Sequence, residues 1–136
     1  MIFVRFEVNA RFDRLLGLMR RSKVYVHPLP GEPFGISTVE AMSAGIIPVV
    51  PDIGGHTEFV PAKYQFHTFG QGVEAVAAAL GAPASERAQM SRLTHQYSTA
   101  NYTKKFQQIA ARVFDISRPL EPAPVISVSK RPEPAA

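Results

Sequence analysis

The chain has 136 residues, 46% of them hydrophobic, which is enough for one domain with a buried core. The absence of cysteine excludes disulfides and thiolate metal sites, and it permits a reducing cytoplasmic setting. The net charge of +4 is concentrated in residues 1–23, where six Arg and Lys residues accompany two acids. Such a basic segment is more often a solvated helix face than a binding surface, so we expect no nucleic-acid partner.

Hydrophobic periodicity predicts alternating strands and helices in the first half of the chain. Pro28 and Pro30 end the second predicted strand, because proline cannot donate to a sheet ladder. Gly45 suits the C-terminal end of the second helix, and the wholly apolar run IIPVVP that follows is typical of a strand buried in a parallel sheet. The predicted strands are 2–8, 23–30 and 46–51, and the predicted helices are 11–21 and 35–45.

The second half of the chain begins with a loop and continues with helices. Gly54 and Gly55 lie in this loop, residues 52–60, where glycine permits backbone conformations that other residues resist. Ser85 and Asn101 are the predicted N-caps of two of the helices. The remaining predictions are an edge strand within 63–69, helices at 72–80, 84–97 and 101–115, and a proline-rich, extended and disordered tail over 117–136.

This alternation predicts an α/β fold with a parallel sheet and right-handed crossovers. We expect residues 1–116 to form this domain and residues 117–136 to form the tail. Charged residues interrupt the apolar ones near the N-terminus, as in neither a signal peptide nor a membrane span, so we expect a soluble protein. Ligands of parallel sheets bind at the carboxyl ends of the strands, which is where Glu32 and Gly35 fall.

Two carboxylates, Glu32 and Glu40, flank the start of the helix predicted at 35–45. The first amides of a helix lack partners and carry the positive end of its dipole, so they suit a phosphate, and Gly35 allows close approach. Glu40 lies roughly 6 Å further along the axis and leans back toward these amides. The geometry fits a ribose beside a diphosphate, although the spacing alone equally fits a surface acid and a helix glutamate favoured by the dipole.

The stretch EPFGISTVEAMSAGIIPVVPDIGGHTEFV closely resembles the Glu-x7-Glu signature of retaining GT-B glycosyltransferases of the group 1 class, which includes glycogen synthases and many mannosyltransferases. The acidic pair, the Phe-Gly turn, the helix end, the Pro-Val-Val strand and the Gly-Gly-x-x-Glu loop occur in the family order and spacing. Weaker similarity covers about residues 1 to 115. The resemblance implies the C-terminal half of a Rossmann-like donor-binding domain.

The same resemblance implies a role for each matching residue. Glu32 is the expected catalytic residue, which contacts hydroxyls of the donor sugar, and Glu40 is expected to hold the ribose. Glu58 is expected to be mainly structural, orienting the loop beside the site. The amides of Phe34, Gly35 and Ile36 are expected to line the sugar and phosphate site, with Ser37 and Thr38 facing the diphosphate.

The resemblance also sets the expected partners. The donor is a nucleotide sugar, with GDP-mannose as our first choice and a UDP-sugar as our second, and no cofactor is implied. We expect no metal site, because His56, His67 and His95 lack metal-ligand spacing. His27, at a strand end, is interpreted as structural.

Only 31 residues precede Glu32, so we expect the acceptor domain and the upstream Arg and Lys clamp for the diphosphate to be missing. The isolated chain should then be inactive and should need an N-terminal acceptor-domain polypeptide, together with a lipid-linked or saccharide acceptor. The expected location is cytoplasmic, with peripheral attachment at the inner membrane face as an option. The alternative hypothesis is a non-catalytic nucleotide-sugar-binding or interaction module.

Overall fold

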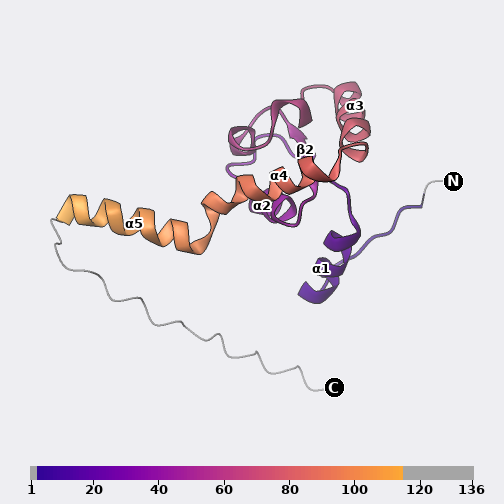
Figure 1. Ribbon diagram of the computed structural model, residues 1–136. Helices are drawn as coiled ribbons and strands as arrows, with labels where there is room; N and C mark the ends of the chain where they lie inside the picture. Colours follow the sequence, from indigo (N-terminus) through magenta and orange to yellow (C-terminus); the bar gives the residue numbers. More distant parts are fainter. Residues whose placement is uncertain (1–2, 115–136) are drawn as a thin grey trace, which may run out of the picture. The chain divides into compact units, whose positions relative to one another are not determined.

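The computed structural model describes residues 3–114 (Figure 1). The chain divides after Ser98 into two compact units, Met1–Ser98 and Thr99–Ala136. The second unit contributes one described helix, α5 (Thr99–Phe114), whose apolar residues Tyr102 and Phe106 are exposed. The tail predicted over 117–136 lies outside the described residues. Among residues 3–114, no helix is both long and apolar enough to cross a membrane.

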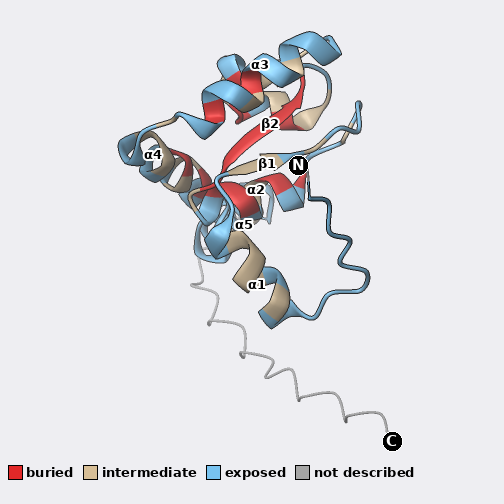
Figure 2. Ribbon diagram, turned by 90° about the vertical axis from the view of Figure 1, so that its right-hand side faces the viewer, coloured by how far each residue is buried: buried red, intermediate tan, exposed pale blue. Residues whose placement is uncertain are grey.

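The first unit is an α/β structure built on a parallel sheet, as predicted. The sheet has three strands in the order β1-β2-β3, and both pairs are parallel. Helix α3 covers one face of the sheet and α2 lies on the other (Figure 2). In chain order the elements are α1 (Phe12–Arg21), β1 (Val24–Val26), α2 (Ile36–Ser43), β2 (Ile47–Pro51), the 3-10 turns η1 (Gly55–Glu58) and η2 (Ala62–Tyr64), β3 (Gln65–Phe66), α3 (Phe69–Leu80), α4 (Ala84–Thr94) and the 3-10 turn η3 (His95–Tyr97).

Strand β2 is the centre of the core, and all five of its residues are buried (Figure 2). Its apolar run has no polar face because α2 and α3 cover both sides of the sheet. The buried cluster around β2 draws on every helix from α2 to α4 and consists of Met42, Ile47, Val49, Val50, Phe59, Val60, Tyr64, Ala75, Ala79 and Met90. The prediction of a buried parallel strand at 46–51 is therefore confirmed.

The central strand tolerates Pro48 because of the way its hydrogen bonds alternate. The Ile47 N–H donates toward β1, to Lys23, and the Asp52 N–H donates toward β3, to Phe66. Odd positions thus face β1 and even positions face β3, so the missing N–H of Pro48 lies on the β3 side. Pairing with β3 begins only at Val50, beyond Pro48, so no ladder bond is lost.

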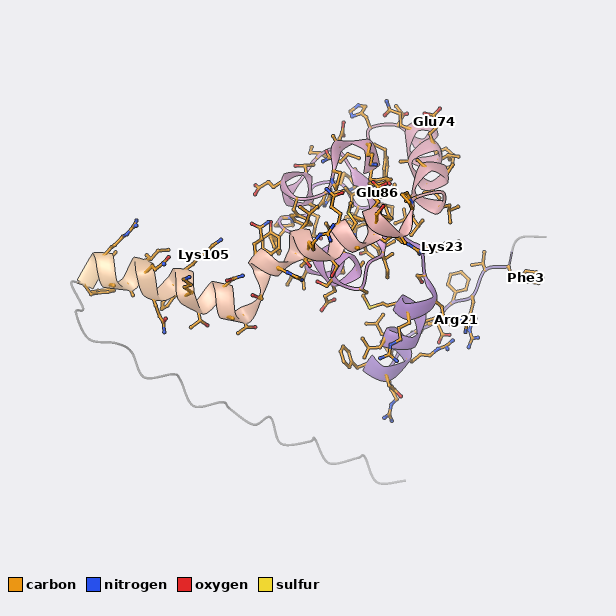
Figure 3. The ribbon with its side chains drawn as sticks, viewed as in Figure 1. Phe3, Arg21, Lys23, Glu74, Glu86 and Lys105 are labelled. Atoms are coloured by element: carbon orange, nitrogen blue, oxygen red, sulfur yellow. The ribbon has the colours of Figure 1, made fainter. Side chains whose placement is uncertain are left out.

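The strand predicted over residues 2–8 is wrong for the part that the structure describes. Residues 3–8 form no strand and are exposed, and Phe3 projects from the segment that precedes α1 (Figure 3). Apolar and β-branched composition favours a strand only where a neighbouring strand is available, and among residues 3–114 β1 pairs with β2 alone. The helix that follows, predicted over 11–21, is confirmed as α1.

Both predicted N-caps are also wrong. Helix α4 starts at Ala84 with Pro83 as its N-cap, so Ser85 is already inside the helix; α5 starts at Thr99, which places Asn101 inside it. The side-chain cap that sequence analysis missed belongs to α3, where Thr68 and Gln71 form a reciprocal capping box. This cap starts α3 at Phe69, three residues before the predicted start, despite two glycines in its first turn.

Candidate functional site

The candidate site is built on the loop that joins β1 to α2, at the carboxyl end of the sheet. Gly35 is the N-cap of α2 and has the left-handed backbone angle φ of 90°. A Cβ at this position would lie 3.1 Å from Thr38 Oγ1, so both the backbone angle and the available space favour glycine. Helix α2 therefore begins where the sequence predicted, with its first amides at the end of the loop.

The Glu32 carboxylate folds back over this turn. Its Oε1 accepts a hydrogen bond from the Gly35 N–H at 3.1 Å and lies 3.5 Å from the Phe34 nitrogen. Its Oε2 lies 3.5 Å from His27 Nε2. The side chain thus sits between the start of α2 and the end of β1, and it is one-quarter exposed. An acid in this place can meet a ligand that approaches the helix N-terminus.

The loop after β2 packs directly on the backbone that carries Glu32. The Gly55 N–H donates to the Glu32 carbonyl at 2.7 Å, and Gly54 forms a parallel bridge with Glu32. A Cβ on Gly54 would come within 2.7 Å of the Glu32 carbonyl oxygen, and one on Gly55 within 2.0 Å of the Pro33 carbonyl oxygen. Two successive glycines are therefore needed because one backbone lies against another.

The two hydroxyl residues that follow Gly35 differ in their surroundings. Ser37 is exposed, and its Oγ lies 2.8 Å from the Tyr25 hydroxyl. Thr38 is fully buried, and its Oγ1 has no hydrogen-bond partner among the described residues. Of the two side chains expected to face a diphosphate, only that of Ser37 is open to solvent in this structure.

Glu40 lies on the exposed side of α2, one turn after Ser37. Both side chains line a hollow of about 210 Å³ between α1, β1 and α2, and Leu18 and Met19 of α1 form part of its apolar wall. Tyr25 lines the same hollow. The structure thus brings Ser37 and Glu40 to one cavity, while Glu32 and Gly35 lie at the N-terminal end of the same helix. Ile36, the first residue of α2, is exposed.

An aromatic cluster packs against the loop between β1 and α2 at Phe34. The rings of Phe34, Phe59 and Tyr97 lie 5.3–5.6 Å apart, centre to centre, in edge-to-face or tilted arrangements. Burial raises the pKa of Tyr97, and the nearby charge of Glu58 adds to the rise. Sequence analysis did not find this cluster, because its members are separated by up to 63 positions and share no motif.

Two histidines lie behind Glu32. His56 is fully buried, and its Nε2–H donates to the Pro51 carbonyl at 2.9 Å. The rings of His27 and His56 meet edge to face at 5.8 Å. Within residues 3–114, no three His, Asp or Glu side chains come close enough together to hold a metal ion.

Comparisons with known proteins show the family of this chain. Residues 4–100 match the profile of the glycosyl transferases group 1 family. The chain is 37% identical over 67 residues to GDP-Man:Man(3)GlcNAc(2)-PP-Dol alpha-1,2-mannosyltransferase of Yarrowia lipolytica. The aligned region covers 49% of this chain and 11% of that protein. The chain is 38% identical over 55 residues to the protein of the same name from Dictyostelium discoideum, covering 40% and 11%.

The matched region thus spans about a tenth of the length of these two relatives. The family match, by contrast, covers most of the chain, from the segment before α1 to the start of α5. Together with the parallel α/β sheet, this match confirms the resemblance read from the sequence. The chain belongs to the glycosyl transferases group 1 family.

Proposed function

We propose that this chain carries the donor-binding part of a retaining glycosyltransferase that uses a nucleotide sugar. One observation carries the proposal: the N-terminus of α2 opens at the carboxyl end of the sheet with Gly35 at its cap and with Glu32 and Glu40 on either side. The buried Thr38 Oγ1 has no partner in the described part of the chain, and it lies under this same turn.

In this proposal each group meets one part of the donor. The amides of Phe34, Gly35 and Ile36 and the Ser37 hydroxyl face the sugar and the diphosphate, where the helix dipole favours negative charge. Glu40 accepts the two ribose hydroxyls. Glu32 accepts hydroxyls of the transferred sugar. The helix amides would also stabilise the charge that develops on the departing diphosphate, which is the usual source of rate enhancement in group transfer.

The names of the two relatives support the choice of donor and acceptor. Both are described as using GDP-Man and a PP-Dol-linked acceptor, so GDP-mannose is the first donor to test and a UDP-sugar the second. In this proposal the acceptor site lies outside the matched region, which covers only 11% of either relative. The isolated chain would then bind a donor without transferring its sugar.

Calorimetry with GDP-mannose, GDP and UDP-glucose tests this proposal. Glu40→Ala should weaken nucleotide binding by about 1.5–3 kcal/mol, because it removes charge-assisted hydrogen bonds to the ribose. Glu74→Ala is the matched control, since Glu74 is an exposed acid on α3, away from α2 (Figure 3). If a well-folded Glu40→Ala chain binds the nucleotide as tightly as the wild type, the proposed site is wrong.

A further inference from the structure

Four polar side chains, those of Ser37, Tyr25, His27 and Glu32, lie in a continuous row at the candidate site. Ser37 Oγ lies 2.8 Å from the Tyr25 hydroxyl, which lies 3.2 Å from His27 Nδ1. On the other side of the imidazole, Nε2 lies 3.5 Å from Glu32 Oε2. The two ends, Ser37 and Glu32, are the residues assigned above to the donor. The two middle residues, from β1 and the position after it, have no role so far.

With a neutral imidazole, the hydrogens of these side chains can be placed in one consistent direction. A carboxylate accepts and cannot donate, so the Glu32 carboxylate favours the tautomer of His27 that carries its hydrogen on Nε2. In a neutral imidazole Nδ1 is then the acceptor, and it takes the Tyr25 O–H. The Tyr25 oxygen is left to accept the Ser37 O–H. The donors then run from the serine to the imidazole, so that each bond polarises the next, and the Nε2 side of the ring lies 3.5 Å from the carboxylate.

The surroundings of His27 favour this arrangement. Its Nε2 is buried and makes no hydrogen bond among residues 3–114, and the Glu32 carboxylate lies 3.5 Å from it, at ion-pair distance. His56, packed against it from η1, uses its own Nε2–H on the Pro51 carbonyl and so presents no competing donor from that nitrogen. The groups that face the ring are therefore Tyr25 from β1, Glu32 from the loop and His56 from η1.

We propose that Tyr25 and His27 are positioning residues of the donor site: Tyr25 holds the Ser37 hydroxyl and His27 by hydrogen bonds, and His27 holds the Glu32 carboxylate through the 3.5 Å contact of its Nε2. The consequence for donor binding rests on the proposed function, but the contacts among these four side chains do not. A glutamate side chain held before the ligand arrives loses less rotational freedom on binding, so its contacts with the sugar hydroxyls contribute more to affinity. Positioning should thus act on the sugar part of the donor and spare the nucleotide.

Single substitutions can remove individual contacts among these four side chains. Tyr25→Phe removes one hydroxyl and separates Ser37 from His27, and Tyr102→Phe is its matched control on the exposed face of α5. His27→Leu removes both ring nitrogens, whereas His27→Gln keeps an N–H donor close to the position of Nε2. A positioning role requires that glutamine restores what leucine loses.

The first measurement needs no donor. The Gly35 N–H donates to Glu32 Oε1, so its exchange with solvent, followed by NMR, reports how firmly the carboxylate is held. We expect about five- to tenfold faster exchange in His27→Leu, the equivalent of one weakened hydrogen bond, and a rate close to wild type in His27→Gln. Tyr25→Phe should also accelerate exchange, and Tyr102→Phe should not. Unchanged Gly35 exchange in every folded variant overturns the proposal.

The second measurement compares GDP-mannose with GDP by calorimetry. In His27→Leu and Tyr25→Phe the affinity for GDP-mannose should fall about five- to tenfold while that for GDP changes less than twofold. An equal loss for both ligands would mean that the residues support the fold and do not position Glu32. If the wild-type protein binds neither ligand, the proposed function fails, and the Gly35 measurement still decides whether Tyr25 and His27 position Glu32.

Discussion

Gly55→Ala tests whether the two loops of the site lie backbone against backbone. An alanine Cβ at this position would lie 2.0 Å from the Pro33 carbonyl oxygen and 3.0 Å from Phe34 Cα. Ordinary contacts of a Cβ begin at about 3.4 Å, so the loops must separate by more than an ångström. The φ angle of Gly55 is not among the positive ones, so an alanine adopts this backbone without strain, and the contact alone determines the effect.

The expected cost follows from two terms. Overpacking against atoms that cannot rotate away costs about 1–3 kcal/mol. Separation of the loops also breaks the hydrogen bond from the Gly55 N–H to the Glu32 carbonyl, worth about 1 kcal/mol. We therefore expect Gly55→Ala to lower the free energy of unfolding by about 2–4 kcal/mol, a large share of the stability of a domain of this size.

Gly17→Ala makes the same chemical change with the opposite expectation. Gly17 lies inside α1, and a Cβ there would have no atom within 4 Å. Alanine should stabilise the helix by about 0.5–1 kcal/mol. Urea unfolding followed by far-ultraviolet circular dichroism measures both variants. The reasoning is refuted if Gly55→Ala unfolds within about 0.5 kcal/mol of the wild type, the range usual for a surface change without consequence.

Three further outcomes are expected. Thr68→Ala should lower the free energy of unfolding by about 1 kcal/mol through loss of the α3 cap, measured by the same urea titration; no change would mean that the cap is dispensable. The hydrogen bond from Lys63 holds the pKa of Glu86, labelled in Figure 3, below its usual value. The stability that this ionised carboxylate contributes is therefore present at neutral pH and is lost as the pH falls through the folded-state pKa. Glu86→Gln should flatten the acid limb of a stability–pH curve, and an unaltered limb would contradict this role of Glu86. The isolated chain should transfer no label from GDP-mannose to a lipid-linked acceptor unless an N-terminal acceptor-domain polypeptide is added, and robust turnover by the chain alone would place the acceptor site within these residues.

Local pattern was enough to predict the elements that hold the site. The run at 46–51 is apolar on both faces because both faces are covered. The helix before it ends at Ser43, and Gly45, two residues later, has a φ of 74° that few other residues adopt. Gly35 could be assigned to the start of the helix for a similar reason. These features depend on residues close together in the sequence, so the sequence alone contains the information.

Features that depend on distant partners could not be predicted in this way. Residues 3–8 have the composition of a strand, yet nothing in that stretch says whether a neighbouring strand exists. The contact of His27 with Glu32 forms only once the loop after β1 has folded back. The contact of Phe34 with Tyr97 joins positions that are 63 residues apart, and periodicity carries no signal for it.

The aromatic cluster also gives the chain an optical signal of its own. The sequence contains no tryptophan and four tyrosines, and Tyr97 is the one whose ring touches both Phe34 and Phe59. Aromatic rings held in fixed mutual orientation produce near-ultraviolet circular dichroism, which disappears when packing loosens even if the helices remain. Because Phe34 belongs to the loop between β1 and α2, the near-ultraviolet spectrum of the unlabelled chain should follow the order of that loop during a ligand titration.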